Sequence, residues 1–343
     1  MTKIIDFKNN INIDDLKEIK STFENGKLVI FPTETVYGIG ANAFDEKAVD
    51  SIFTAKGRAN DNPLIVHIAS KDMLDTLAQK PNEIEQKLID AFMPGPFTLI
   101  LKKKDTIPNN VTCNLDTVGI RFPENEIARR IIEYTNLPIA APSANISSKP
   151  SGTKIDDIKD EFNDKVDIIV DGGECKIGVE STVVKVIDGI PTILRPGKIT
   201  PEDIIKVANV VKLDNHVFGE VNSNEKVESP GMKYKHYAPK TKCILIYGTT
   251  NDNYLDLINE HLTDKTTIIG FKEHQEYYPN INYLVSGSIN NLDEISHNIF
   301  SLLRKADTFN SDLIIIEGVK KEGLGIAIMN RLLRSSSFNY IEK

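Results

Sequence analysis

The sequence has few of the features that mark secreted or membrane-bound proteins. It contains three cysteines and no tryptophan in 343 residues. Cys113, Cys175 and Cys243 are isolated, so they fit neither a disulfide framework nor the paired spacing of a zinc site. No apolar run approaches the roughly 20 residues that a bilayer span needs. The N-terminal stretch MTKIIDFKNN lacks the basic head and apolar core of a secretion signal. We therefore expect a cytoplasmic protein with no membrane association.

Positive charge and catalytic signatures are scarce as well. The formal net charge is −8, whereas proteins that bind nucleic acid by neutralising phosphates carry the opposite surplus, so we expect no stable nucleic-acid binding. Local basic clusters can still hold a phosphorylated small molecule. The sequence has no GxSxG, HExxH, CxxC or GxxxxGK[ST] pattern, and it pairs no evident nucleophile with a base. A covalent mechanism is therefore not indicated.

The length predicts two domains, each with its own α/β pattern. In residues 1–208, β-rich runs alternate with helical spacing, and Asp45 and Asn82 stand where helix N-caps belong. The predicted strands are 27–32, 64–69, 97–102, 118–123, 137–142, 166–173 and 181–187. The predicted helices are 45–55, 82–92 and 126–135. This alternation predicts one mixed α/β sheet.

The rest of the chain is predicted to be a linker and a small second domain. Residues 209–241 are polar and aperiodic, and long connections of this kind are commonly functional loops or spacers. The strands predicted beyond them are 243–248, 266–271, 282–287 and 313–319, with helices at 253–262, 292–308 and 325–335. We expect residues 242–343 to form a parallel α/β domain with helices on both faces of its sheet.

Two early motifs are candidates for chemistry. FPTETVYGIG places Thr35 and other polar groups at a strand exit, where ligands of open α/β sheets bind, although such hydroxyls also satisfy their own turns. TAKGRANDNPLIVHI offers Lys56 and Arg58 around a glycine, which suits a phosphate cradle or a solvated charged loop. In the strand that ends this motif, His67 taken alone indicates a packed core imidazole.

Later segments add neutral and charged donors. LPIAAPSANISSKPSGT presents Ser143, Asn145 and Ser151 after a strand, as a triphosphate site or as an ordinary serine-rich turn. Arg121 lies within the apolar strand VGIRFP and needs an anionic partner, either a structural carboxylate or a substrate carboxylate. Together these residue types favour positioning and electrostatic stabilisation of a phosphoanhydride.

The ordered set of motifs resembles the threonylcarbamoyl-AMP synthase family. PTETVYGIGANA, KGRANDNPLIVHI, PGPFTLIL, VGIRFP, APSANISSKPSGT, GVESTVV and LRPG cover residues 20 to 200 almost continuously. SPGMKYKHYAP and GLGIAIMNRLLRSS resemble the two-domain form of that family. The resemblance implies a YrdC-like twisted mixed sheet with helices, followed by a long linker and a small Rossmann-like domain.

The resemblance also implies a reaction. L-threonine and bicarbonate would give an N-carboxylate that attacks the α-phosphorus of ATP, releasing pyrophosphate and leaving threonylcarbamoyl-adenylate. Mg²⁺ would accompany the phosphates. A separate tRNA threonylcarbamoyl transferase complex would pass the group to the adenosine beside the anticodon of tRNAs that read codons beginning with A.

Residue by residue, the resemblance implies a catalytic set, an ATP-binding set and a threonine-binding set. The residues expected to act in catalysis are Lys56, Arg58, Ser143 and Asn145. Those expected to bind ATP are Arg58, Asn62, Thr117, Ser143, Ser151, Arg195, His236 and Tyr237. Those expected around L-threonine are Thr35, His67, Arg121, Ala141 (through its backbone) and Ser181. No protein ligand is expected for the metal ion.

The linker and the second domain receive different expectations from the resemblance. SPGMKYKHYAP would fold over the first domain as a lid with His236 or Tyr237 near the nucleotide, excluding water. The alternative is that its tyrosines only anchor the linker to a surface. No obvious site is expected in the second domain. Backbone N–H groups at the start of the helix in GLGIAIMNRLLRSS could bind an anion, but the favoured interpretation is that Ile326, Ile328, Leu332 and Leu333 are core.

Three other functions compete with the synthase. Hydrogenase-maturation carbamoyltransferases share such a domain but also carry zinc-type cysteine pairs, which this sequence lacks. The net charge of −8 argues against a non-catalytic RNA-binding module. A regulatory sensor that binds ATP without turnover would have a degenerate site, and the presence of Lys56, Arg58, Ser143 and Asn145 argues against it.

Overall fold

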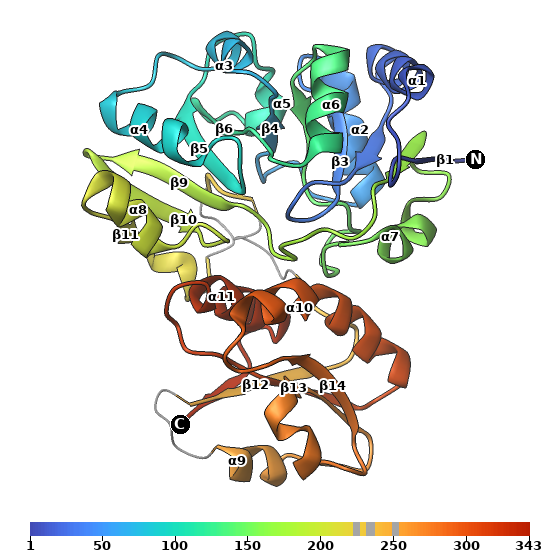
Figure 1. The fold of residues 1–343 in the computed structure, drawn as a ribbon, viewed down its shortest axis with the longest axis vertical. Coiled ribbons are helices and arrows are strands. Elements are labelled where there is room, and N and C mark those ends of the chain that lie inside the picture. Colours follow the sequence, from blue (N-terminus) through green and yellow to red (C-terminus); the bar gives the residue numbers. More distant parts are fainter. Residues whose placement is uncertain (222–226, 231–236, 249–253) are drawn as a thin grey trace.

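The structure, a computed structural model, describes the chain apart from residues 222–226, 231–236 and 249–253. Within the described residues the strands form an 11-stranded sheet and a 5-stranded sheet. The large sheet and its helices make an upper lobe, and the small sheet lies in a lower lobe (Figure 1). Helices α10 (Leu292–Ala306) and α11 (Gly325–Ser335) occupy the layer between the small sheet and the upper lobe.

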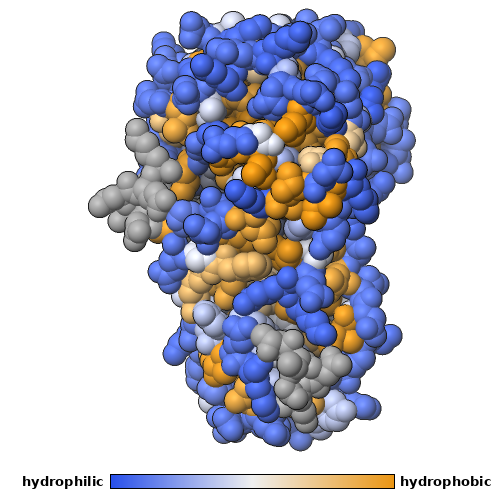
Figure 2. Space-filling view, turned by 90° about the vertical axis from the view of Figure 1, so that its left-hand side faces the viewer, coloured by the Kyte–Doolittle hydropathy of each residue, from blue (hydrophilic) through white to orange (hydrophobic). Residues whose placement is uncertain are grey.

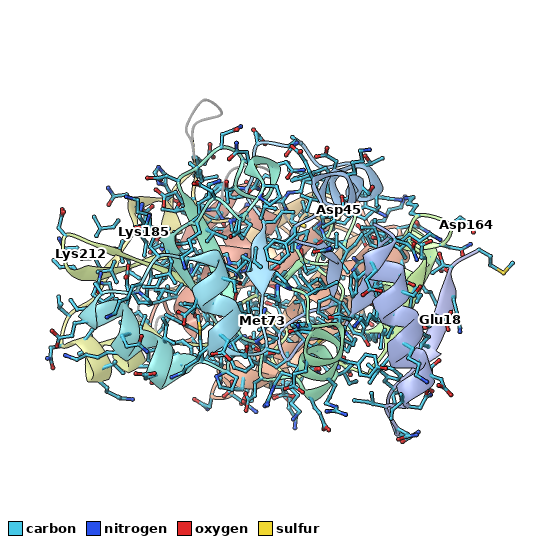
Figure 3. All side chains as sticks on the ribbon, turned by 90° about the horizontal axis from the view of Figure 1, so that it is seen from above. Glu18, Asp45, Met73, Asp164, Lys185 and Lys212 are labelled. Atoms are coloured by element: carbon cyan, nitrogen blue, oxygen red, sulfur yellow. The ribbon has the colours of Figure 1, made fainter. Side chains whose placement is uncertain are left out.

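The large sheet is mixed, as predicted. Its strands, in spatial order, are β1 (Lys3–Asp6), β8 (Ile168–Asp171), β2 (Val29–Phe31), β3 (Gly38–Asn42), β7 (Ile139–Ala140), β4 (Ile65–His67), β6 (Thr117–Arg121), β5 (Phe97–Lys102), β9 (Thr182–Ile187), β10 (Ile190–Arg195) and β11 (Lys212–Leu213). Strand β8 lies between β1 and β2 and is parallel to both. Seen from above, Lys212 of β11 and Glu18 of the helix beside β1 lie at opposite ends of this lobe (Figure 3).

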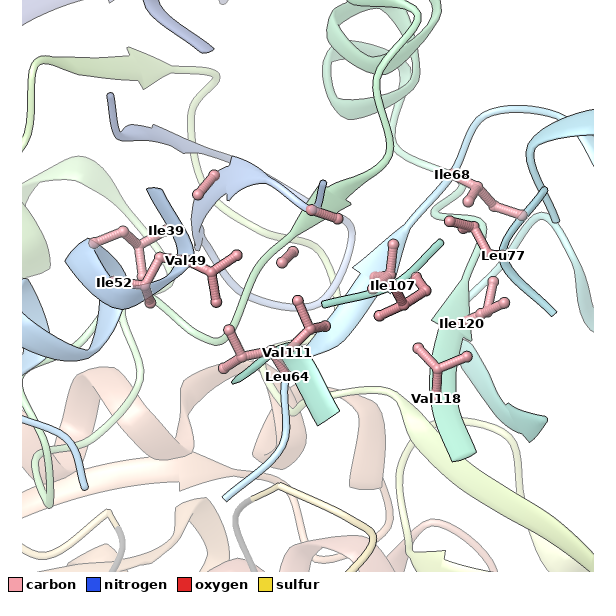
Figure 4. Packing of buried hydrophobic residues seen from close by; sticks show 14 of the residues in the cluster. Ile39, Val49, Ile52, Leu64, Ile68, Leu77, Ile107, Val111, Val118 and Ile120 are labelled. Carbon is pink, nitrogen blue, oxygen red and sulfur yellow. The ribbon is translucent and has the colours of Figure 1, made fainter. Parts of the chain in front are cut away.

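Helices cover the large sheet and close its core. They are α1 (Ile13–Glu24), α2 (Glu46–Lys56), α3 (Lys71–Leu77), α4 (Glu83–Phe92), α5 (Asn109–Thr112), α6 (Glu126–Thr135), α7 (Ile155–Phe162) and α8 (Pro201–Ala208). Ile52 of α2 packs beside Ile39 of β3, and Leu64, Val111 and Val118 extend the same buried cluster along the sheet (Figure 4).

Helix α2 explains how the first basic motif is positioned. Asp45 caps its start, as predicted, because the carboxylate accepts hydrogen bonds from the backbone N–H groups of Lys47 and Ala48. Its end is set by Gly57, whose φ of 60° is left-handed and favours glycine. Lys56 and Arg58 therefore flank the point where the chain leaves the helix.

The small sheet is parallel throughout, as predicted. Its strands, in spatial order, are β14 (Asn282–Gly287), β13 (Thr266–Phe271), β15 (Leu313–Glu317), β12 (Cys243–Tyr247) and β16 (Tyr340–Glu342). Helix α9 (Leu255–Glu260) lies on the face opposite α10 and α11, so helices cover both faces (Figure 1). The 3-10 turns of the chain are η1 (Asn215–Val217), η2 (Lys272–Tyr277) and η3 (Asp307–Phe309).

Several elements differ from the sequence expectations. The sequence patterns missed β1, β3, β10, β11 and β16, and helices α1, α3, α5, α7 and α8. Strand β7 has only two residues, although pairing continues beyond it: the Pro142 carbonyl oxygen accepts from Ile39 N–H at 3.0 Å, and Ser143 forms an isolated bridge with Gly38. The described part of 209–241 contains β11 and η1 rather than an aperiodic chain.

The face shown in Figure 2 is mostly hydrophilic, with hydrophobic residues gathered toward its middle. Among the described residues, no helix combines the length and apolar character needed to cross a bilayer.

Candidate active site

One pocket in the upper lobe brings together residues from most of the predicted motifs. It lies beside the turn between β2 and β3, next to the ends of β4 and β6. The predicted site residues that line it are Arg58, His67, Arg121, Ala141, Ser143, Ser181, Arg195 and Tyr237. Three arginines therefore face one small space, which makes the pocket suited to anions.

Arg121 is the buried cation that the sequence left without a named partner. Its Nη2 donates to Glu34 Oε1 at 2.6 Å and to Thr33 Oγ1 at 3.4 Å. Both charged side chains are only 5% exposed. Glu34 is thus a structural carboxylate that offsets the charge, a role that the resemblance gave to the substrate. The Nε–H of Arg121 is buried and has no acceptor in the part of the chain that the structure describes, so the guanidinium keeps a donor for a second anion.

His67 lies next to Arg121 on the neighbouring strand. The two residues are direct partners in the parallel register of β4 and β6. Burial, helped by the charge of Arg121, lowers the pKa of His67 to about 3, so its imidazole is neutral at physiological pH. Its Nδ1 has no hydrogen-bond partner among the described residues. His67 can therefore hydrogen-bond a ligand without adding charge.

Lys56 does not line the pocket but holds its wall. The buried ammonium donates to the backbone carbonyl oxygens of Ser143 and Asn145, the latter at 2.6 Å. Burial, followed by the nearby charge of Arg58, holds the pKa of Lys56 well below its usual value. Asn145 is also turned inward, because its Oδ1 accepts from the Ser143 hydroxyl at 2.6 Å and its Nδ2 donates to Lys149. Lys56 and Asn145 thus shape the loop that presents Ser143.

Arg58 reaches the pocket from the loop after α2. Its Nη2 donates to the carbonyl oxygen of Asn62 at 2.9 Å, which ties the loop to the guanidinium. Asn62 is 1% exposed, and neither its side-chain nitrogen nor its side-chain oxygen has a partner within the described structure. Such a buried amide is costly unless something pairs with it, so it is a candidate for ligand contact outside the pocket lining.

Ser151 and Glu180 join the pocket to the lower lobe. Ser151 does not line the pocket; its hydroxyl donates to Glu180 Oε1 at 2.6 Å. Glu180 does line it, and its Oε2 accepts from Arg331 Nε of α11 at 2.8 Å. Burial opposes the charge of Glu180, but Arg331 and then Arg195 outweigh it and keep the pKa of this carboxyl below its usual range.

Arg195 and Ser181 form the opposite wall. The Nη2 of Arg195 donates to the carbonyl oxygen of Ser181 at 3.0 Å and to its Oγ at 3.1 Å. The Ser181 hydroxyl also lies 2.8 Å from the Thr98 hydroxyl. Burial lowers the pKa of Arg195 to about 10, so the side chain stays a cation at neutral pH.

Two other predicted residues lie outside the lining. Thr35 is fully buried behind the β2–β3 turn, where its hydroxyl meets that of Thr33 at 2.9 Å. Thr117 lies at the far end of β6 from Arg121, and its hydroxyl donates to Glu228 at 3.5 Å. Thr117 is therefore close to the linker rather than to the pocket.

The described ends of the predicted lid segment reach the pocket. Pro230 and Tyr237 both line it, and the Pro230 carbonyl oxygen accepts from Arg195 Nη1 at 3.1 Å. Tyr237 is 3% exposed and adopts a left-handed φ of 62°. His236, the other lid residue predicted near the nucleotide, lies outside the described residues.

Known families cover nearly all of the chain. A family model described as "Telomere recombination" matches residues 21–197, and one described as "Threonylcarbamoyl-AMP synthase, C-terminal domain" matches residues 199–337. A protein from Pyrococcus abyssi named threonylcarbamoyl-AMP synthase is 42% identical, with 100% of both chains covered. The chain belongs to the threonylcarbamoyl-AMP synthase family.

Further relatives agree with this membership. The threonylcarbamoyl-AMP synthase of Bacillus subtilis is 39% identical, with 97% of this chain and 96% of that protein covered. The crystal structure of P. abyssi Sua5 complexed with L-threonine superposes with a TM-score of 0.92 at 41% identity, covering 100% of both chains. Escherichia coli YciO, at 22% identity and a TM-score of 0.52, shares the fold over 57% of this chain.

In this family member, sequence reasoning gave no role to three charged residues in and around the pocket. Glu34 was counted only among the polar groups of PTETVYG, and Glu180 of GVESTVV was not named. Arg331 stands in a helix of which only apolar residues were considered, and it is fully buried. An arginine within an apolar helix was the available signal, because a buried guanidinium requires a carboxylate partner.

Proposed function

We propose that this chain makes L-threonylcarbamoyl-adenylate from L-threonine, bicarbonate and ATP. The observation that carries the proposal is the pocket lined by Arg58, Arg121 and Arg195 in a chain whose relatives are named threonylcarbamoyl-AMP synthase. The P. abyssi relative whose structure is described as complexed with L-threonine supports threonine as the amino acid.

The proposed reaction is an adenylyl transfer. The threonine amine and bicarbonate give an N-carboxylate with loss of water. One carboxylate oxygen then forms a bond to the α-phosphorus of ATP, and the bond from that phosphorus to the bridging oxygen of pyrophosphate breaks. The nucleophile is already an anion, so the protein needs no general base for this step; cations that offset the charge of the phosphates are the main requirement.

The residues fall into two sides of the pocket under this proposal. Arg121 would bind the threonine carboxylate through its uncommitted donor, with neutral His67 and Ser181 beside it. Arg58, Ser143 and Arg195 would face the nucleotide. Tyr237 would cover the pocket and exclude water from the mixed anhydride.

Mg²⁺ would enter with ATP rather than bind a dedicated site. Glu180 is the acidic side chain in the lining of the pocket, and both its oxygens already accept hydrogen bonds from Ser151 and Arg331. The described residues contain no cluster of three or more potential metal-ligating side chains. The phosphate oxygens of ATP and water would therefore be the ligands of the ion.

The product is an unstable anhydride, so its consumer is proposed to be a tRNA threonylcarbamoyl transferase complex that modifies the adenosine beside the anticodon. This chain itself would bind tRNA weakly at most, in keeping with its net charge of −8.

Pyrophosphate release tests the proposal. Purified protein is incubated with ATP, Mg²⁺, bicarbonate and radiolabelled L-threonine, and the labelled adenylate is followed together with pyrophosphate. Both are expected only when threonine and bicarbonate are present. Arg58→Ala is expected to abolish release, whereas Arg130→Ala, on an arginine of α6 that is 54% exposed, is expected to leave it unchanged. ATP that is untouched by threonine and bicarbonate would refute the synthase function.

A further inference from the structure

Helix α11 of the lower lobe is buried on all sides. Every one of its residues is buried, although the helix packs on the small sheet with one face only. Ile328 and Leu332 belong to the core of the lower lobe, whereas Asn330 and Arg331 contact residues before the small sheet. A polar face that is buried without water must find partners in the protein, and here the upper lobe and the linker supply them.

Arg331 is the member of that face that contacts the pocket lining, without lining the pocket itself. Its Nε donates to Glu180 Oε2 at 2.8 Å, and its Nη2 donates to the carbonyl oxygen of Pro196 at 3.0 Å. The third direction is filled by Asn330, whose Oδ1 accepts from Nη1 at 2.6 Å. The guanidinium is therefore fixed in three directions, which a lysine in its place could not reproduce.

The same guanidinium supports the aromatic ring that covers the pocket. The guanidinium carbon lies 5.6 Å from the centre of the Tyr237 ring, within the range of a cation–π contact. Tyr237 also stacks on Phe300 of α10 in the lower lobe, with ring centres 5.0 Å apart. The described end of the lid segment is thus packed against the lower lobe.

Glu180 makes this contact important for the chemistry. Its carboxylate lines a pocket proposed to take a polyanion, and a like charge there would repel the phosphates. Arg331 compensates that charge, and the second carboxylate oxygen of Glu180 holds the Ser151 hydroxyl at 2.6 Å. Separation of the lobes would therefore remove the main charge partner of Glu180, leaving Arg195 to offset the carboxylate beside the ligand. It would also free the Glu180 side chain that holds Ser151 to move.

We propose that Arg331 is a positioning residue for the active site, by which the lower lobe completes the nucleotide side of a pocket that otherwise belongs to the upper lobe. It acts through Glu180 on Ser151 and through the ring of Tyr237 on the cover of the pocket. The assignment of this side to a nucleotide rests on the proposed function.

A second interlobe pair provides a matched control. Arg304 of α10 donates from Nη1 to Glu161 Oε1 at 2.8 Å, the same length as the pair between Arg331 and Glu180. Neither Arg304 nor Glu161 lines the pocket. Arg304 also donates from Nη2 to the carbonyl oxygen of Pro150, next to Ser151, so it is an interlobe contact with the same loop that touches neither Glu180 nor Tyr237. If Arg331 only joined the lobes, loss of either arginine would have the same effect on ligand binding.

The test compares the full-length variants Arg331→Gln, Arg304→Gln and the double variant Arg331→Gln with Glu180→Gln. Calorimetry measures the affinity for a non-hydrolysable ATP analogue with Mg²⁺, and circular dichroism verifies folding. Arg331→Gln is expected to weaken binding about tenfold or more, and Arg304→Gln less than twofold. The double variant, which has no unpaired carboxylate, is expected to fold and to bind with intermediate affinity.

The outcomes separate this inference from the proposed function. Equal weakening of binding in Arg331→Gln and Arg304→Gln would overturn the positioning role. If Arg331→Gln does not fold, wild-type affinity of the double variant would overturn it instead. If the wild-type protein binds the analogue but releases no pyrophosphate, the synthase activity is refuted. The affinities of the variants for the analogue would then still decide the role of Arg331. No binding of the analogue by the wild type would overturn both.

Discussion

The buried pair of Arg121 and Glu34 allows stability and substrate binding to be separated. Both side chains are 5% exposed, and Nη2 lies 2.6 Å from Oε1. Breaking a buried pair by removing one partner costs about 3–5 kcal/mol, because the other charge is left uncompensated. One kcal/mol shifts Tm by about 2–4 °C in a lobe of roughly 200 residues, so Arg121→Met should lower the Tm of the upper lobe by about 6–20 °C.

The double variant Arg121→Met with Glu34→Met should regain most of that stability, because replacing a whole buried pair by apolar side chains is often nearly neutral. It should not regain affinity for threonine. Loss of a charge-assisted hydrogen bond of about 1.5–3 kcal/mol corresponds to roughly 10- to 150-fold weaker binding. Differential scanning calorimetry gives Tm, and titration calorimetry with L-threonine gives Kd. A stable double variant that binds threonine as tightly as the wild type would refute the assignment of Arg121 to the substrate carboxylate.

Two further predictions concern the lower lobe and its junction with the upper lobe. The hydrogen bond that His274 Nδ1 donates to Glu317 Oε2 at 2.6 Å raises the pKa of His274 against the effect of burial. The pair therefore stabilises the fold fully below about pH 6.5, and this stabilisation is lost as pH rises through the raised pKa. In urea unfolding, the free energy of unfolding of His274→Gln should lack this decline with pH, and a decline as steep as that of the wild type would exclude the pair as its source. Gly178→Ala should loosen the lobes, seen as faster proteolysis between them, because its Cβ would lie 2.4 Å from the Ser296 carbonyl oxygen. Gly189→Ala, with a similar positive φ but open space, should cost only backbone strain and leave proteolysis unchanged.

The sequence predicted the long, strongly patterned elements and missed the short ones. Segment 97–102 became β5 without change, because its continuous apolar run fits a strand buried on both faces. Strands such as β1 and β11 have only a few residues and gain their order from pairing with β8 and β10, which local patterns cannot reveal. The parallel sheet of the lower lobe was predictable because its strands are apolar and regularly spaced.

The site was predicted in its composition more fully than in its geometry. Motif by motif, the sequence indicated which segments carry the polar groups, and Arg121, Arg58 and Arg195 do face one pocket. It did not indicate that Lys56 points at backbone carbonyls. An ammonium can donate to any oxygen within reach, and the loop that supplies these oxygens lies 87 positions further along the chain. The role of Glu180 depended on a lobe contact that no local pattern encodes.

The insertion of β8 between β1 and β2 has a consequence for how the chain acquires its fold. Residues 3–6 pair with residues 168–171, so the edge of the large sheet can close only after most of the upper lobe has been synthesised. Until then β2 presents an unpaired edge of apolar residues, and exposed edges of this kind invite association between chains. Long-range pairing also slows folding, because loop entropy is lost before the contacts form. The nascent upper lobe is therefore expected to need protection from aggregation until Ile168–Asp171 emerges from the ribosome.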